Sequence, residues 1–162
     1  MKNLLMLLLT FVIASCSSDN DSKEIVSDMS AKFLQENFVG SEVAYKLNDE
    51  VKLGVSEKDL INSFNKFSEK VKLEKKAVDI EILTINDKNY VRFYNDDKSV
   101  STVALLKTSK IENNTQNGVK MMIGETVCTS GACANCCGCI PDGSYCSACE
   151  LNNNDCRRTT SG

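Results

Sequence analysis

Apolar residues recur along the middle of this chain with a helical period in one stretch and an alternating period in others. Between residues 56 and 73 the apolar side chains fall three or four positions apart, which is the spacing of one face of an α-helix. These positions are Leu60, Ile61, Phe64, Phe67 and Val71. Ser56 followed by Asp59 resembles a capping box with Asp in place of Glu. The pattern therefore predicts an amphipathic helix over residues 56–73.

A similar helical pattern lies upstream of it. The apolar residues that would share one helix face there are Ile25, Val26, Met29 and Phe33. Asp21 and Ser22 precede this stretch and are residue types that cap a helix N-terminus, and Gly40 follows it. The sequence thus predicts a second amphipathic helix that ends before Gly40.

Alternation of apolar with polar or small residues predicts strands in the rest of residues 23–127. Two short alternating runs, residues 43–47 and 51–55, flank Asn48-Asp49-Glu50 and predict a hairpin. Further strand-like runs cover residues 78–85, 90–94, 100–107 and 119–127, with a polar loop over 109–118. Short turns favour an antiparallel meander over parallel crossovers. The predicted fold class is α+β, with two amphipathic helices, a short hairpin and an antiparallel meander, followed by a small cysteine-rich C-terminal module.

The N-terminal residues differ in character from the rest of the chain. Lys2 is followed by a run from Leu4 to Ile13 that is apolar except for Thr10. A helix that crosses a membrane needs about 20 apolar residues, so this run is too short to span one and suits a signal peptide. The run ends in Ile13-Ala14-Ser15-Cys16, an aliphatic residue, two small residues and a cysteine. Together these residues resemble the leader and lipobox of a bacterial lipoprotein.

The resemblance implies a lipid anchor at Cys16. In that family the lipobox cysteine becomes the mature N-terminus, its sulfur carries a diacylglycerol, and its amino group is usually acylated as well. One acyl chain binds a membrane only marginally, whereas two or three hold a protein there stably. The acidic tether in residues 16–22 resembles the surface-export signal of Bacteroidetes lipoproteins. The expected location is therefore the outer membrane, on its periplasmic or its surface side.

The other cysteines are crowded near the C-terminus. The eight form the pattern C-x4-C-x2-C-C-x-C-x6-C-x2-C-x6-C and are Cys128, Cys133, Cys136, Cys137, Cys139, Cys146, Cys149 and Cys156. Turn-forming residues separate them, and only Ile140, Tyr145 and Leu151 are apolar residues of a size that forms a core. A segment of this composition needs covalent or metal cross-links to hold a structure.

Three chemistries fit these cysteines. Because an exported chain meets oxidising machinery and the eight are even in number, four disulfides are the first. The second is zinc, since Cys133-x2-Cys136 and Cys146-x2-Cys149 have the spacing of zinc knuckles and eight thiolates fill two tetrahedral sites. The third is a redox couple in one C-x-x-C pair, as in thiol-disulfide oxidoreductases. The oxidising compartment favours the disulfides and predicts no bound metal.

The rest of the composition removes several classes of function. The chain has no histidine, which excludes Ser-His-Asp and Cys-His catalysis and zinc sites with imidazole ligands. It has no glycine-rich phosphate loop, and its formal net charge of -3, with no basic stripe, gives no footprint for nucleic acid. We therefore predict no catalytic residues and no cofactor.

The sequence thus predicts a membrane-anchored lipoprotein of the cell envelope that acts as a binding or structural module. Its expected partners are the membrane, through the lipid, and an envelope or extracellular protein or glycan. A thiol-disulfide oxidoreductase and a zinc-binding lipoprotein are the alternatives. The expected organisation is a signal peptide (1–15), a lipidated cysteine with its tether (16–22), the α+β domain (23–127), the cysteine-rich module (128–156) and a tail (157–162).

Overall fold

The computed structural model describes residues 32–34, 36–108, 118–136, 138–149, 151–152 and 154–160. Strands take up 47% of the described residues and helices 16%. The described part of the chain is therefore mostly β and not clearly α+β, while the expected antiparallel meander and cysteine-rich C-terminal region are confirmed. The cysteine-rich segment and the residues after it add strands that the apolar pattern does not predict.

The amphipathic helix predicted over residues 56–73 is confirmed as α2, Glu57–Lys70. Its N-cap is Ser56, whose side-chain oxygen accepts a hydrogen bond from the Asp59 amide at 3.1 Å and donates one to the Asp59 carboxylate at 2.6 Å. The cap satisfies an amide that the first turn leaves without a helical partner. The helix buries the face that carries Leu60, Phe64 and Phe67.

Of the stretch predicted as the upstream helix, Lys32–Leu34 and Glu36 are helical among the described residues. Phe33, expected on its apolar face, is 50% exposed, whereas its neighbour Leu34 is buried in the core. The predicted face was therefore displaced by one residue at this end. Ile25, Val26 and Met29 lie outside the described residues.

The predicted hairpin and meander form one antiparallel sheet. Its strands are β1 (Glu42–Leu47), β2 (Glu50–Leu53), β3 (Ala77–Ile85), β4 (Lys88–Asn95), β5 (Val100–Lys107) and β6 (Val119–Ser130). They lie in the order β2-β1-β6-β5-β4-β3, so β1 returns to pair with the last meander strand. Two-residue turns with positive φ, Asn48-Asp49 and Asn86-Asp87, close the β1–β2 and β3–β4 hairpins.

The C-terminal residues 157–160, expected as part of a tail, form a further strand. This strand, β9 (Arg157–Thr160), pairs antiparallel with the second half of β6, from Thr126 to Thr129. The first half of β6 pairs with β1 along the same edge. β6 also extends beyond residue 127, so Cys128 lies within the strand and does not follow it as expected.

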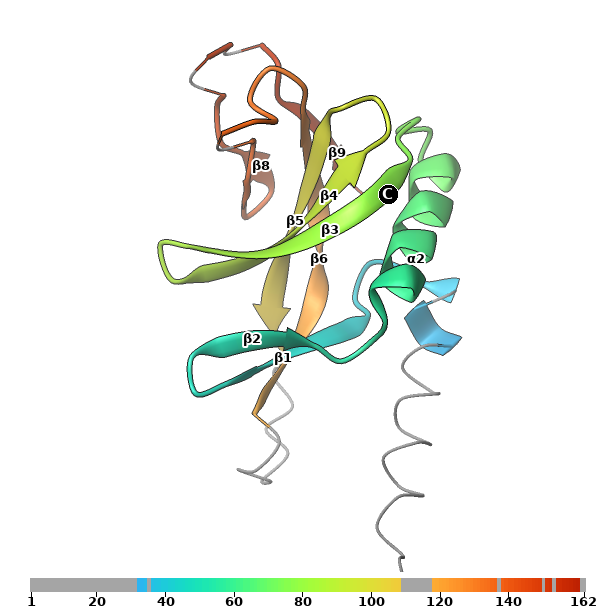
Figure 1. Ribbon diagram of the computed structural model, residues 1–162, viewed down its shortest axis with the longest axis vertical. Coiled ribbons are helices and arrows are strands. Elements are labelled where there is room, and N and C mark those ends of the chain that lie inside the picture. The colour runs from blue at the N-terminus through green and yellow to red at the C-terminus, as the bar shows by residue number, and fades with distance from the viewer. Residues whose placement is uncertain are drawn as a thin grey trace, which may run out of the picture.

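The two faces of the sheet are covered by different material, as Figure 1 shows, with α2 on one side and the cysteine-rich segment on the other. The face toward α2, here called the inner face, holds the main core, which includes Phe38, Phe64, Phe93 and Val103. Phe64 and Phe93 stack with their ring centroids 4.2 Å apart, and Phe38 meets both rings edge-on. None of the described helices has the length and apolar character needed to cross a membrane.

Candidate functional site: the cysteine module

The cysteine module, residues 128–156, is cross-linked by three disulfides among the described residues. The bonded pairs are Cys128–Cys146, Cys133–Cys149 and Cys139–Cys156, with Cα atoms 5.7 to 5.9 Å apart. The first three of these six cysteines thus bond to the last three in the same order, so the three closed loops overlap. The three bridges thus connect the first part of the module, up to Cys139, with its second part, from Cys146 onward.

Three cysteines singled out in the sequence, Cys16, Cys136 and Cys137, are not part of these three bridges as the structure describes them. Cys136 is exposed, and its sulfur lies 3.6 Å from the carbonyl oxygen of Cys133. Cys137 and the predicted lipid-attachment site Cys16 lie outside the described residues. The disulfide interpretation of the module is therefore confirmed for six of its cysteines.

Sulfur atoms form the core of the module. Cys128, Cys133, Cys139 and Cys149 are fully buried, and Cys146 and Cys156 pack against them. The three apolar residues expected to form a core behave differently, since Tyr145 is 73% and Leu151 is 71% exposed, and Ile140 is half-buried. Disulfides replace apolar burial here because the short loops between cysteines leave no room for large side chains to converge.

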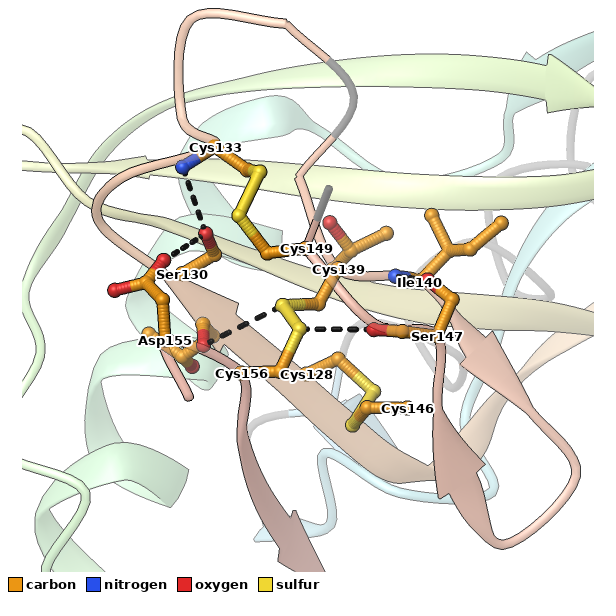
Figure 2. Close-up of a disulfide and its surroundings, with 12 residues drawn as sticks. Cys128, Ser130, Cys133, Cys139, Ile140, Cys146, Ser147, Cys149, Asp155 and Cys156 are labelled. Atoms are coloured by element: carbon orange, nitrogen blue, oxygen red, sulfur yellow. Dashed lines mark hydrogen bonds between the residues drawn. A yellow bond between two sulfur atoms is a disulfide. The ribbon is translucent and has the colours of Figure 1, made fainter. Parts of the chain in front are cut away.

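Asp155 fixes the loop that leaves the end of β6. Its carboxylate accepts a hydrogen bond from the buried Ser130 hydroxyl (Figure 2). It accepts another from the Ala132 amide at 2.9 Å. Ser130 in turn accepts from the Cys133 amide at 3.1 Å. These donors, the Ser130 hydroxyl first, hold the pKa of Asp155 below its ordinary value. The ionised carboxylate therefore orders the backbone next to the Cys133–Cys149 bridge.

A two-stranded hairpin forms the outer part of the module. Its strands are β7 (Pro141–Asp142) and β8 (Tyr145–Cys146), joined through Gly143, whose φ is 61°. Just outside the hairpin, Ile140 and Ser147 exchange hydrogen bonds, with the Ile140 amide donating to the Ser147 hydroxyl at 2.9 Å. Covalent and hydrogen-bonded links thus fix both ends of this hairpin.

Two cations tie the same hairpin to the main sheet. Lys88, at the start of β4, forms an ion pair with Asp142 at 2.9 Å. The hydrogen bond and attraction between them raise the pKa of Lys88 and lower that of Asp142. On the other side, Arg158 of β9 donates a hydrogen bond to the Ser144 carbonyl at 2.8 Å. The hairpin is held from two different strands.

The module rests directly on the outer face of the sheet. Gly138 has a φ of 59°, and a Cβ atom there would come within 3.0 Å of the Arg92 guanidinium and 3.2 Å of Val100. Arg92 of β4 is only 5% exposed and donates to the Thr102 hydroxyl of β5 at 3.4 Å. Glycine is therefore required at position 138 both for its backbone conformation and for the close approach to Arg92.

A shallow groove of about 320 Å³ lies where the hairpin overhangs the sheet. Its floor includes the small residues Ala104 and Gly124, and its walls include Leu106, Met122 and Pro141. Opposite Ala104, β6 bulges, because Val103 pairs with Val127 while Leu105 pairs with Ile123. The module and the bulge together shape a concave surface on this side of the molecule.

This geometry bears on the three predicted chemistries. Neither C-x-x-C pair is joined internally, because Cys146 and Cys149 bond to Cys128 and Cys133 instead. The same bonds occupy sulfurs that zinc would need. Across the part of the chain that the structure describes, no group of three or more cysteine or acidic side chains is placed to hold a metal ion.

Sequence reasoning missed the residues that position the module. Ser130 is the last residue of β6 and Asp155 directly precedes Cys156, and no local pattern joins residues so far apart in the chain. Arg92 interrupts the apolar residues of β4, Tyr90-Val91-Arg92-Phe93-Tyr94. A charge on the face away from the helix ordinarily indicates a solvated face, so it gave no signal that this face is covered. Lys88 and Arg158 gave no signal beyond their charge.

No protein-family model matches this chain, no curated protein matches its sequence, and no solved structure matches its fold.

Proposed function

We propose that this protein is a lipid-anchored lipoprotein of the outer membrane and that its disulfide-linked module presents a binding surface to an envelope or extracellular protein or glycan. The lipobox ending at Cys16 supports the anchor, and the three disulfides are those of a chain that folds in an oxidising compartment. In this proposal the tether of residues 16–22 separates the membrane from the folded domain.

The exposure of Tyr145 and Leu151 is the observation that carries the binding role. Both side chains project from a backbone that neighbouring disulfides, Cys128–Cys146 and Cys133–Cys149, hold in place. Large apolar side chains on a rigid backbone lose little conformational entropy when a partner covers them. Tyrosine adds a hydroxyl that hydrogen-bonds with protein and glycan surfaces alike.

The anchor is tested by Cys16→Ser, because serine cannot form the thioether. We expect the wild-type chain in the membrane fraction with a lipid-modified mature N-terminus, and the variant either released into the soluble fraction or retained with its leader uncut. Fractionation and mass spectrometry of the N-terminal peptide measure both. A variant that is processed like the wild type and still partitions into detergent contradicts the anchor.

The binding surface is tested in cells with a photoreactive amino acid in place of Tyr145. Lys66, exposed on α2 on the opposite side of the sheet, serves as the matched control position. We expect a discrete cross-linked adduct from position 145 and none from position 66. Equal adducts from both positions, or none from either, contradict the role of the module.

A further inference from the structure

We propose that the open edge of β3 is a docking site for an extended polypeptide strand whose side chains alternate between apolar and basic. The proposal goes beyond the function given above, since it uses neither the lipid anchor nor the surface of the cysteine module. The occupant would join the sheet as an additional strand.

β3 is a long edge strand that carries two carboxylates, Asp79 and Glu81, and a register shift after Ala77, but lacks lysine and proline. Its nine residues pair only with β4, and among the described residues no other strand pairs with it. Natural edge strands are shortened, or carry lysine or proline, to prevent pairing with other chains. β3 contains neither residue type, and Val78 near its start is 58% exposed. Its edge is therefore available to another strand.

The hairpin register shows which backbone groups face that edge. Ile85 pairs with Lys88 across the turn Asn86-Asp87, whose φ values of 49° and 61° are those of a type I′ turn. The residues that flank such a turn form a hydrogen-bonded pair, and bonded pairs alternate with non-bonded pairs along an antiparallel ladder. Leu83 and Glu81 thus bond to β4. The backbone N–H and C=O groups of Ile80, Ile82 and Thr84 therefore point away from β4, to the open edge.

A groove of about 350 Å³ lies beside this edge. It is lined by Ile80, Glu81 and Ile82 of β3, by Val51, Lys52 and Leu53 of β2, and by Glu57 of α2. Side chains alternate along a strand, so every second residue of an added strand would face Ile80, Ile82 and the apolar residues of β2. Those positions of the occupant are therefore apolar.

The charges around the groove indicate which residues suit the other positions of the added strand. Glu57 and Glu81 line the groove, and Glu81 keeps its negative charge while it accepts a hydrogen bond from the Tyr94 hydroxyl at 2.6 Å. The lysine of the groove, Lys52, is already in an ion pair with Glu50 at 3.2 Å. Asp79 adds a further exposed carboxylate on β3. Opposite charges across a strand pair stabilise it and like charges destabilise it. These acidic residues favour a basic partner and disfavour a second copy of β3.

The test uses the full chain, purified without reductant and in a non-ionic detergent, and synthetic peptides of nine residues to match the length of β3. The probe alternates lysine and valine. Two comparison peptides have the same sequence with N-methyl groups on every second residue, in either phase, and a third alternates glutamate and valine. N-methylation keeps side chains and charge but removes the backbone donors. Calorimetry measures each affinity.

Two variants locate the site. Ile82→Pro removes the amide that faces the open edge, whereas Ile82→Ala shortens the same side chain and keeps the amide. Thermal unfolding monitored by circular dichroism establishes that both fold. Tyr145→Ser changes the module surface and should leave peptide binding unchanged, so the outcome here is independent of the proposed role of the module.

We expect saturable binding of the Lys-Val peptide. Binding should be weaker by at least about tenfold for the Glu-Val peptide and for at least one N-methylated peptide, since these changes remove opposite-charge pairs or several hydrogen bonds. It should be weaker by about two- to tenfold for Ile82→Pro relative to Ile82→Ala, since proline removes one backbone donor. Absence of binding at millimolar peptide overturns the proposal. Binding that survives N-methylation in both phases, or that Ile82→Pro does not weaken beyond Ile82→Ala, also overturns it, because the peptide is then held by charge alone.

Discussion

One sheet carries two cores made of different materials. On the inner face, phenylalanine and aliphatic side chains from α2 and the strands pack together, and the apolar period of the sequence predicts α2 and the strands of that core. On the outer face, three disulfides occupy the position that apolar side chains occupy on the other side. The comparison shows that a sheet face can be covered either by apolar side chains or by a disulfide-linked segment. The length of the elements that cover the face decides which of the two is available. A helix of fourteen residues can present an apolar face, whereas short turns cannot.

The largest effect should come from opening the inner core with Phe64→Ala. Phe64 is fully buried between Phe38 and Phe93, so the substitution leaves a cavity and should lower the free energy of unfolding by about 3–5 kcal/mol. Chemical denaturation measures it. Lys66→Ala, on the exposed face of the same helix, should change stability by less than about 0.5 kcal/mol. A similar loss in both variants would contradict a dominant role for burial of Phe64, because alanine favours a helix at both positions.

The outer core should respond to removal of a disulfide. Cys133→Ala combined with Cys149→Ala breaks one bridge and should cost about 2–4 kcal/mol, because the unfolded chain regains the freedom that the bridge removed. Hydrogen exchange should accelerate in β7, β8 and β9 and stay slow in α2 and β4. If protection is lost equally on both faces, the two cores unfold as one unit and the comparison fails.

The state of all the cysteines follows from mass. Three disulfides remove six hydrogens, so the non-reduced chain should be lighter than the reduced chain by at least about 6 Da. A difference of about 8 Da with no titratable thiol in denaturant would show that Cys136 and Cys137 are oxidised as well. Zinc ligation predicts free thiols after chelation and metal bound in stoichiometric amount, which would contradict the disulfides.

A smaller effect is expected for Asp155→Asn, which weakens the hydrogen bonds from Ser130 and Ala132. We expect a loss of about 1–2 kcal/mol at neutral pH. Because folding lowers the pKa of Asp155, its contribution is complete above the ordinary pKa of about 3.9 and disappears as the pH falls through the folded value. Denaturation between pH 2 and 7 should therefore show a shallower acid dependence in the variant. Parallel curves for the two proteins would contradict this role.

The smallest effect should follow Lys88→Gln. Both members of the Lys88–Asp142 pair are exposed, and exposed ion pairs contribute little to stability. Global stability should be unchanged, whereas amide exchange in β7 and β8 should become somewhat faster and lose its dependence on salt. A clear fall in global stability would mean that the module is held to the sheet by charge more than by its bridges.

The two cores also differ in how far the sequence predicts them. α2, the β1–β2 hairpin and the meander follow from local periods and turn residues such as Asn86-Asp87, and the structure confirms them. β9 could not be predicted, since Arg-Arg-Thr-Thr has no apolar alternation and becomes a strand only through its distant partner β6. The cysteine spacing predicts cross-links but not their pairing, because eight cysteines allow 105 connectivities. Phe33 shows the same limit, since a face read from spacing alone can be displaced by one residue.

The order of the disulfides also fixes an order of events during synthesis. Each bridge joins one of the first three bonded cysteines to one of the last three, so none can close before Cys146 has emerged, when nearly all of the chain has been made. The residues that build the inner core precede Cys128 in the sequence and are complete by then. β9 arrives last, next to the final bridge partner, Cys156. A ribosome or translocon that released this chain a few residues early would leave the inner core intact and one stretch of β6 without its neighbour.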